Sequence, residues 1–259
     1  MNILMVGCGN MGGALLKHWA DVPATDFTVV DPHTSFSHPR IAVLHSADPL
    51  ADQIFDMIVV AIKPQLIDQI MPEHAKRLRD GGAVLSIAAG FSATRLSNAL
   101  NGAPVIRVMP NMPAAIGKGV SGIFFTEGVS NASREMAHDL MTATGEVVEV
   151  DAEDSLDKVT AIAGSGPGYV FELARAYVEA ARSLGFDAEQ SRTLVLGTLS
   201  GAVEMAIQSG EDLTALRNAV TSKAGTTEAG LEALNGAGLL TRLFEETTTA
   251  AYQRAIELR

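Results

Sequence analysis

A glycine-rich segment near the N-terminus is the first place where residue types and spacing indicate chemistry. Gly7, Gly9 and Gly12 form the pattern G-x-G-x-x-G directly after an apolar run. Between a strand and a helix, such glycines permit a tight turn and a close approach to a pyrophosphate, which the free N–H groups of the helix start can bind. Asp31 ends the next apolar run, where a carboxylate can bind both hydroxyls of a ribose. The spacing predicts a dinucleotide site, the alternative being a glycine-rich turn that only packs.

Asp31 also bears on which dinucleotide binds. A carboxylate there repels the 2′-phosphate of NADP and pairs well with a free ribose diol, so we expect a weak preference for NADH. His33 and Arg40 follow in the same loop and could offset this repulsion, or could be ordinary surface residues. Cys8 has no obvious base beside it, so we interpret it as a packing residue rather than a nucleophile.

Further candidates follow the ends of other predicted strands and the start of one helix. Lys63 and Pro64 lie where ligands bind in open α/β sheets, although a surface lysine before a helix fits as well. Residues 86–90 form a second strand end made of small residues, and Asn111 stands between two prolines that could hold it rigidly over the same edge. The segment 221–228 offers hydroxyls and a helix N-terminus to a small carboxylate, or forms an ordinary cap.

The elements that position these residues change in kind near residue 152. Before it, runs that are apolar on both faces alternate with helical stretches, which predicts a doubly wound α/β domain over residues 1–152. From residue 153 to residue 259 the pattern is helical. We expect strands at 3–6, 27–30, 41–44, 57–62, 83–87, 105–109, 122–125 and 146–150, and helices at 11–20, 65–78 and 130–142.

The composition limits the partners and the compartment. Thirty acidic against 19 basic residues give a net charge of −11, the wrong sign for general binding of nucleic acid. No stretch is apolar over the ~18 residues that a membrane span needs, so we expect no membrane contact. One cysteine and an N-terminus that reads as a strand favour the cytoplasm. The six histidines lack the spacing of metal ligands, so we expect no metal.

One predicted helix indicates association with a second subunit. Residues 193–207 carry a single charge, Glu204, over about four helical turns, so the helix is apolar nearly all round. A domain of roughly 100 residues would not cover such a helix. The mean hydropathy of +0.19 is also high for a monomer of this size. We therefore expect a homo-oligomer.

Taken in order, these segments resemble the pyrroline-5-carboxylate reductase family over nearly the whole chain. The resemblance rests on Gly-Cys-Gly-Asn-Met-Gly at 7–12, Ala-Ile-Lys-Pro at 61–64, Arg-Val-Met-Pro-Asn at 107–111, Gly-Ser-Gly-Pro-Gly-Tyr at 164–169, and Val-Thr-Ser with Gly-Thr-Thr between 220 and 227. It implies an N-terminal Rossmann-type domain and a C-terminal all-helical domain that forms a homodimer, alone or within a larger ring of dimers. It also implies NAD(P)H-dependent hydride transfer to the C=N bond of 1-pyrroline-5-carboxylate, giving L-proline in the last step of proline biosynthesis.

The resemblance further implies roles for individual residues. Thr227 would hydrogen-bond the ring nitrogen of the substrate, as proton donor or as orienter. The substrate would be bound by Ser222, Gly225, Thr226 and Thr227, with Asn111 as a further contact. The cofactor would be lined by Val6, Gly7, Cys8, Gly9, Asn10, Met11, Gly12, Asp31, Ala61, Ile62, Lys63, Pro64, Ala88 and Ala89.

The chain departs from the family pattern, and two other functions stay open. Lys223-Ala224 stands where the family commonly has Pro-Gly, and Met112 where it has Thr, so the substrate could be another cyclic imino acid. The first alternative is a β-hydroxyacid dehydrogenase with Lys158 as acid or base, although Ile162 stands where that class has asparagine. The second is a dinucleotide-sensing protein without catalytic activity.

Overall fold

The computed structural model describes residues 1–258, which form two compact units. The first unit comprises residues 1–165 together with the residues from Ala251 onward, and the second comprises Gly166–Ala250. The predicted domain boundary between residues 152 and 153 lies inside the first unit, whose continuous stretch ends at residue 165. This boundary stays a prediction.

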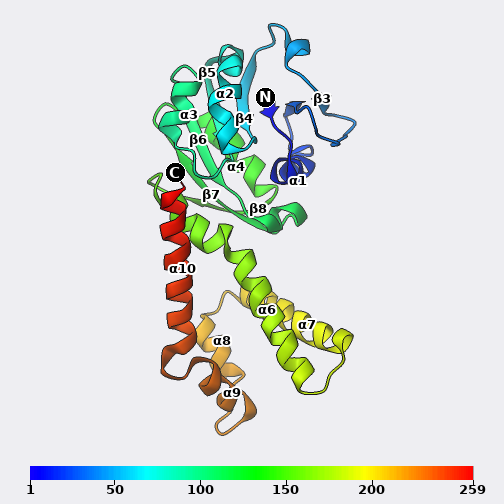
Figure 1. The fold of residues 1–259 in the computed structure, drawn as a ribbon, viewed down its shortest axis with the longest axis vertical. Coiled ribbons are helices and arrows are strands. Elements are labelled where there is room, and N and C mark those ends of the chain that lie inside the picture. The colour runs from blue at the N-terminus through cyan, green and yellow to red at the C-terminus, as the bar shows by residue number, and fades with distance from the viewer. Residues whose placement is uncertain (259) are drawn as a thin grey trace. The chain divides into compact units, whose positions relative to one another are not determined.

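An eight-stranded sheet forms the centre of the first unit (Figure 1), with the order β3-β2-β1-β4-β5-β6-β7-β8. The first six strands run parallel, β7 runs antiparallel to β6, and β8 runs parallel to β7. This confirms the predicted doubly wound class, with two extra strands at one edge. The strands are β1 (Asn2–Val6), β2 (Asp26–Val30), β3 (Ala42–Leu44), β4 (Phe55–Val60), β5 (Leu78–Ser86), β6 (Val105–Met109), β7 (Gly119–Phe125) and β8 (Gly145–Glu149).

Alternate residues of the strands face opposite sides of the sheet, and both sides are buried. Ile3 and Met5 pack with residues of α1 (Asn10–Trp19) and α4 (Asn131–Thr142). Leu4 and Val6 pack on the other side with residues of α2 (Ile67–Ile70) and α3 (Ala93–Ala99). Burying each such side chain contributes roughly 1.5–3 kcal/mol, so the two cores hold the strand ends in fixed positions.

The segment predicted as one helix at 65–78 is not continuous. It consists of a 3-10 turn η2 (Pro64–Leu66), the single α-helical turn α2, and a second 3-10 segment η3 (Met71–Arg77). Pro72 lies inside this stretch, and because proline lacks an N–H and clashes with the preceding turn, it prevents one long α-helix. The proline was the sequence signal against the prediction.

The second unit consists of helices with almost no buried core. Its described residues include only four buried ones, Ala174, Ala181, Ser191 and Val195. Large apolar side chains are exposed instead, among them Phe171 at 70% and Ile207 at 71%. Within residues 1–258, no helix is long and apolar enough to cross a membrane. The helices are α6 (Gly166–Ser183), α7 (Ala188–Ser209), α8 (Leu213–Ala219), α9 (Thr226–Asn235) and α10 (Leu239–Glu257), the last of which ends in the first unit.

Candidate cofactor and substrate sites

The loop after β1 touches the loop after β4, because these strands are neighbours in the sheet. Gly7 has φ +91, and a Cβ on it would lie 2.7 Å from the carbonyl oxygen of Ala61 and from a methyl carbon of Ile62. The N–H of Ala61 donates to the carbonyl of Val6 at 2.8 Å. Only glycine fits at position 7.

The start of α1 is open toward a ligand. Gly9 is the residue before the helix, and among the described residues no side chain caps the first turn. A Cβ on Gly9 would have no described atom within 4 Å. The unpaired N–H groups of the first turn carry the positive end of the helix dipole, which favours an anion. A dinucleotide pyrophosphate therefore fits this loop.

Asp31, at the end of β2, is fastened to the glycine loop. Its Oδ2 accepts a hydrogen bond from the N–H of Cys8 at 2.6 Å, and its Oδ1 accepts one from the N–H of His33 at 2.8 Å. Each carboxylate oxygen keeps a further lone pair, which a ribose hydroxyl can use. The carboxylate is thus held beside the open start of α1 in a fixed orientation.

Arg40 does not lie beside Asp31. Its guanidinium donates to Asp21 Oδ1 at 2.6 Å and to the carbonyl of Ala20, at the C-terminal end of α1. In the described structure, Arg40 therefore does not neutralise the charge of Asp31. The side chain of His33 is exposed.

Cys8 is a buried packing residue in the structure. Burial raises the pKa of its thiol, a hydrogen bond with Thr34 opposes that shift, and the charge of Asp31 adds to it. The thiol therefore stays protonated near neutral pH, which agrees with a packing role.

The remaining predicted cofactor residues follow β4 and β5 at the same edge of the sheet. Ala61 and Ile62 lie just beyond the end of β4, because β4 begins and ends two residues earlier than the strand predicted at 57–62. Lys63 is exposed in an extended conformation before η2. Ala88 is buried, and its N–H donates to Ser86 Oγ at 3.2 Å, whereas Ala89 is exposed. The four predicted cofactor segments thus lie at one edge of the sheet, at the carboxyl ends of β1, β2, β4 and β5.

Asn111 is occupied by contacts within the first unit. Its Oδ1 accepts a hydrogen bond from the N–H of Val120 at 2.9 Å, and its Nδ2 donates to the carbonyl of Ala163 at 3.0 Å. Ala163 belongs to a π-helical turn, η5 (Thr160–Gly164). Asn111 therefore ties the end of β6 to β7 and to this turn, and its contact with a substrate stays a prediction.

The predicted substrate residues gather at the start of α9. Gly225 precedes the helix, its N–H donates to the carbonyl of Ser222 at 3.0 Å, and a Cβ on it would lie 2.9 Å from that carbonyl oxygen. Ala224 has φ +57, and its N–H donates to Glu228 Oε2 at 2.6 Å. Among the described residues no side chain caps α9, so its first N–H groups are free to bind a small carboxylate.

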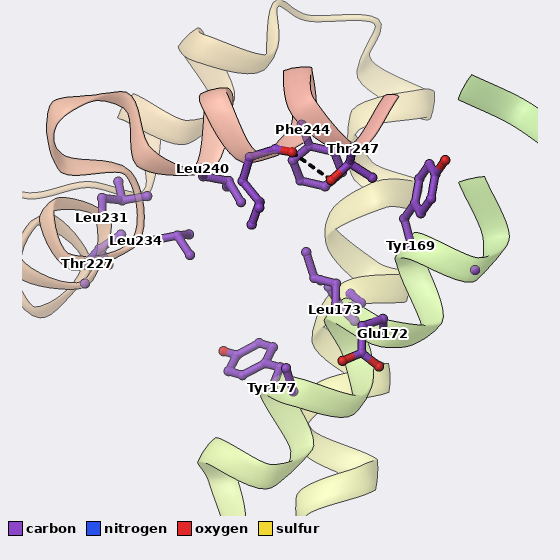
Figure 2. A pocket seen from close by; sticks show the side chains of 15 residues that line it. Tyr169, Glu172, Leu173, Tyr177, Thr227, Leu231, Leu234, Leu240, Phe244 and Thr247 are labelled. Atoms are coloured by element: carbon purple, nitrogen blue, oxygen red, sulfur yellow. Dashed lines mark hydrogen bonds between the residues drawn. The ribbon is translucent and has the colours of Figure 1, made fainter. Parts of the chain in front are cut away.

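Thr227 lines a large apolar cavity of about 910 Å³ within the second unit. Figure 2 shows side chains of α6, including Tyr169 and Tyr177, facing those of α9 and α10, including Leu231 and Phe244. The hydroxyl of Tyr169 is buried and has no hydrogen-bond partner among the described residues. Tyr169 ends the motif at 164–169 on which the family resemblance partly rests, but it was not among the predicted site residues.

One contact of the cofactor loop escaped the sequence analysis. Thr34 Oγ1 donates a hydrogen bond to the carbonyl of Cys8 at 3.2 Å, across 26 positions of the chain. Nothing local to Thr34 predicts this pairing. In residues 1–258, no group of three or more His, Cys, Asp or Glu side chains could hold a metal ion.

The fold and these sites define a Rossmann-type dinucleotide-binding protein with an additional helical domain. Residues 153–258 match the family model for pyrroline-5-carboxylate reductase dimerisation. A pyrroline-5-carboxylate reductase of Pseudomonas aeruginosa is 36% identical over 266 residues, covering 99% of this chain and 96% of the relative. The chain therefore belongs to the pyrroline-5-carboxylate reductase family.

Solved structures agree with this assignment. A pyrroline-5-carboxylate reductase of Coxiella burnetii has a TM-score of 0.92 and 31% identity, covering 99% of this chain and 98% of that one. A Plasmodium falciparum pyrroline carboxylate reductase with NADP bound has a TM-score of 0.85 and 25% identity, covering 100% and 99%. The family resemblance and the fold class are thereby confirmed. The match to the dimerisation model confirms the expectation of a homo-oligomer.

Proposed function

We propose that this chain is an NAD(P)H-dependent reductase of 1-pyrroline-5-carboxylate that forms L-proline. One observation carries this proposal. In a chain of this family, two helices, α1 and α9, begin without a side-chain cap among the described residues. One, at Gly9, suits a pyrophosphate, and the other, at Gly225, suits a small carboxylate.

The cofactor, when bound, supplies the hydride that reduces the C=N bond. The chain's own residues bind and orient it. Gly7 and Gly9 let the backbone approach the pyrophosphate, and the N–H groups of Asn10 to Gly12 face its charge. Residues 61–64, with Ala88 and Ala89, line the neighbouring strand ends.

We propose a weak preference for NADH. Asp31 is held by two N–H groups and would accept hydrogen bonds from a ribose diol, while its charge would repel a 2′-phosphate. Arg40 pairs with Asp21 at the far end of α1, which leaves that repulsion standing. The Plasmodium relative carries NADP, so measuring both cofactors is essential.

The substrate loop would bind the imino acid through its backbone. The N–H groups that open α9 would receive the carboxylate, with Ser222 and Thr226 contributing hydroxyls. Thr227 would hydrogen-bond the ring nitrogen and either donate a proton or orient the ring. Because a protonated imine is already electrophilic, holding it at the right distance and angle is the main demand on the protein.

The chain departs from the family pattern at Lys223-Ala224, in the substrate loop of the second unit, and at Met112, in the first unit. Ala224 takes the left-handed conformation, with φ +57, at the position where the family commonly has glycine. Lys223 is exposed beside it, and Met112 is 60% exposed after β6. We propose that the loop keeps its shape despite Ala224, so the substrate remains a small cyclic imino acid.

The partner we propose is a second copy of this chain. The exposed apolar side chains of α6 and α7, including Phe171 and Ile207, require cover that one chain does not give.

Other expectations remain predictions from the sequence. They are a larger ring of dimers, a cytoplasmic location, and the absence of a metal, a membrane contact and a nucleic-acid partner.

The test is oxidation of NADH and NADPH by the purified protein, with and without 1-pyrroline-5-carboxylate, with the product checked as proline. Imine-dependent oxidation of either cofactor supports the proposal. NADH binding without turnover of this imine contradicts it, and assays with larger cyclic imino acids then separate another substrate from a sensor. Oxidation of 3-hydroxy acids that is abolished by Lys158→Ala would instead establish the dehydrogenase alternative.

A further inference from the structure

The loop after β2 is hydrogen-bonded to both backbone polar groups of Cys8, its N–H and its carbonyl, in the glycine loop. Asp31 accepts from the N–H of Cys8 at 2.6 Å, and Thr34 donates to the carbonyl of Cys8 at 3.2 Å. The two contacts come from residues three positions apart. They prevent the loop from rotating about a single anchor.

The Thr34 hydroxyl has a second role in this arrangement. It accepts a hydrogen bond from the N–H of Phe36 at 3.1 Å while it donates to Cys8. The ring of Phe36 packs against the core on the α1 side of the sheet. Thr34 therefore joins three parts of the structure: the glycine loop, the turn at 34–36 and the core. We call these two hydrogen bonds of its hydroxyl the Thr34 latch.

We propose that Thr34 is a positioning residue that increases the discrimination between NADH and NADPH by holding residues 31–36 against the glycine loop. The inference rests on the proposed cofactor role of Asp31. Thr34 need not touch the cofactor, because the latch acts by restricting where the Asp31 carboxylate can move.

The direction of the effect follows from charge. A 2′-phosphate adds roughly two negative charges, which a fixed carboxylate repels. To admit NADPH, the loop must move Asp31 away, and that movement breaks the contacts with Cys8. A ribose diol makes no such demand, since it donates hydrogen bonds to the carboxylate in place. The latch therefore weakens NADPH binding more than it affects NADH binding.

The test uses Thr34→Val, which keeps the branched shape but removes the hydroxyl, and Thr34→Ser, which restores it. Ser35→Ala is the matched control, because Ser35 is exposed in the same loop. Isothermal titration gives the Kd of each cofactor without any requirement for turnover. Because Thr34→Val loses one hydrogen bond to the glycine loop, we expect it to lower the ratio of the NADPH Kd to the NADH Kd by about three- to tenfold. Thr34→Ser and Ser35→Ala keep the wild-type ratio.

Steady-state kinetics add a second measurement. We expect the KM for NADH to rise in Thr34→Val while kcat stays near the wild-type value, because Thr34 is assigned no contact with the reacting atoms. The inference is overturned if the Kd ratio of Thr34→Val stays within about twofold of wild type, or if both cofactors weaken equally.

Asp31→Asn separates this inference from the proposal on which it rests. If Asp31→Asn removes the NADH preference and Thr34→Val does not change it, only the latch fails. If Asp31→Asn leaves the ratio unchanged, the cofactor role of Asp31 fails, and the latch fails with it.

Discussion

The carbonyl oxygen of Ala61 stands 2.7 Å from the point where a Cβ on Gly7 would lie. Two strand ends are therefore in backbone contact at the edge of the sheet, and no side chain separates them. This contact places the start of α1 next to residues 61–64. A side chain at Gly7 would therefore clash within the protein, whereas a side chain at Gly9 would not.

Gly9→Ala should fold normally but bind NADH poorly. The φ of Gly9 is an ordinary −72, and the added methyl would have no described atom within 4 Å, so the protein itself would not clash. The methyl would occupy the space required by the pyrophosphate, and we expect the Kd for NADH to rise more than about tenfold. Titration and a thermal melt measure both properties. Gly7→Ala is the comparison, since it should lower the melting temperature; wild-type NADH affinity in Gly9→Ala would contradict the assigned site.

Thr227→Ala should lower turnover without affecting cofactor binding. Losing a hydroxyl at the ring nitrogen is expected to reduce kcat/KM for 1-pyrroline-5-carboxylate by at least about tenfold, equivalent to ~1.4 kcal/mol. Thr227→Ser, which keeps the hydroxyl, should retain most of the activity. Near-normal kinetics in Thr227→Ala would remove this residue from the mechanism.

Ala224→Gly should stabilise the protein. Ala224 has φ +57, a conformation that costs a residue with a Cβ about 1–2 kcal/mol, and glycine adopts it at less cost. After allowance for the greater freedom of glycine in the unfolded chain, we expect the free energy of unfolding to rise by about 0.5–1 kcal/mol. Urea denaturation measures the difference. Ala229→Gly, inside α9, should have the opposite sign, because glycine disfavours a helix interior.

His74 should make the folded protein less stable in mild acid. The residue is 1% exposed, its ring nitrogens have no hydrogen-bond partner among the described residues, and the Glu73 carboxylate, 3.3 Å from Nε2, lies outside hydrogen-bond geometry. Burial lowers the pKa of His74, the Glu73 charge opposes this, and Arg77 adds to it. Below the unfolded pKa of 6.5, the unfolded chain therefore binds a proton that the folded one resists. Stability is lost as the pH falls toward the folded pKa.

Urea denaturation at about pH 7.5 and about pH 5 measures this loss. His74→Leu should lose less stability between the two values than wild type, because leucine does not titrate. Glu73→Gln should lose more, since it removes the charge that favours protonated His74. Equal losses in all three proteins would contradict the assignment.

The sequence predicted those parts of the fold that depend on local pattern. Two-sided apolar runs such as Ile3–Val6 predicted the parallel strands, and the glycine spacing predicted the loop after β1. The prediction of one helix at 65–78 was wrong because it followed the apolar spacing and disregarded Pro72, which interrupts an α-helix.

Contacts between distant residues were beyond reach. Nothing near Asn111 in sequence indicates that its amide binds Val120 and Ala163, and nothing near Thr34 indicates Cys8. Arg40 could equally have reached Asp31 from its place in the chain, yet it pairs with Asp21. Such pairings depend on how loops cross at the sheet edge, which the packed structure alone determines.

The second unit is an insertion in the first, because the chain leaves at residue 165 and re-enters at Ala251. Leu258 then lies within the first unit, where its carbonyl oxygen is 2.5 Å from the position that a Cβ on Gly90, next to Ala89, would take. A single proteolytic cut among the helices between 166 and 250 therefore leaves a part of the first unit on both fragments. A protease must cut twice to excise the helical unit, so nicked protein would keep all the pieces of its cofactor-binding half.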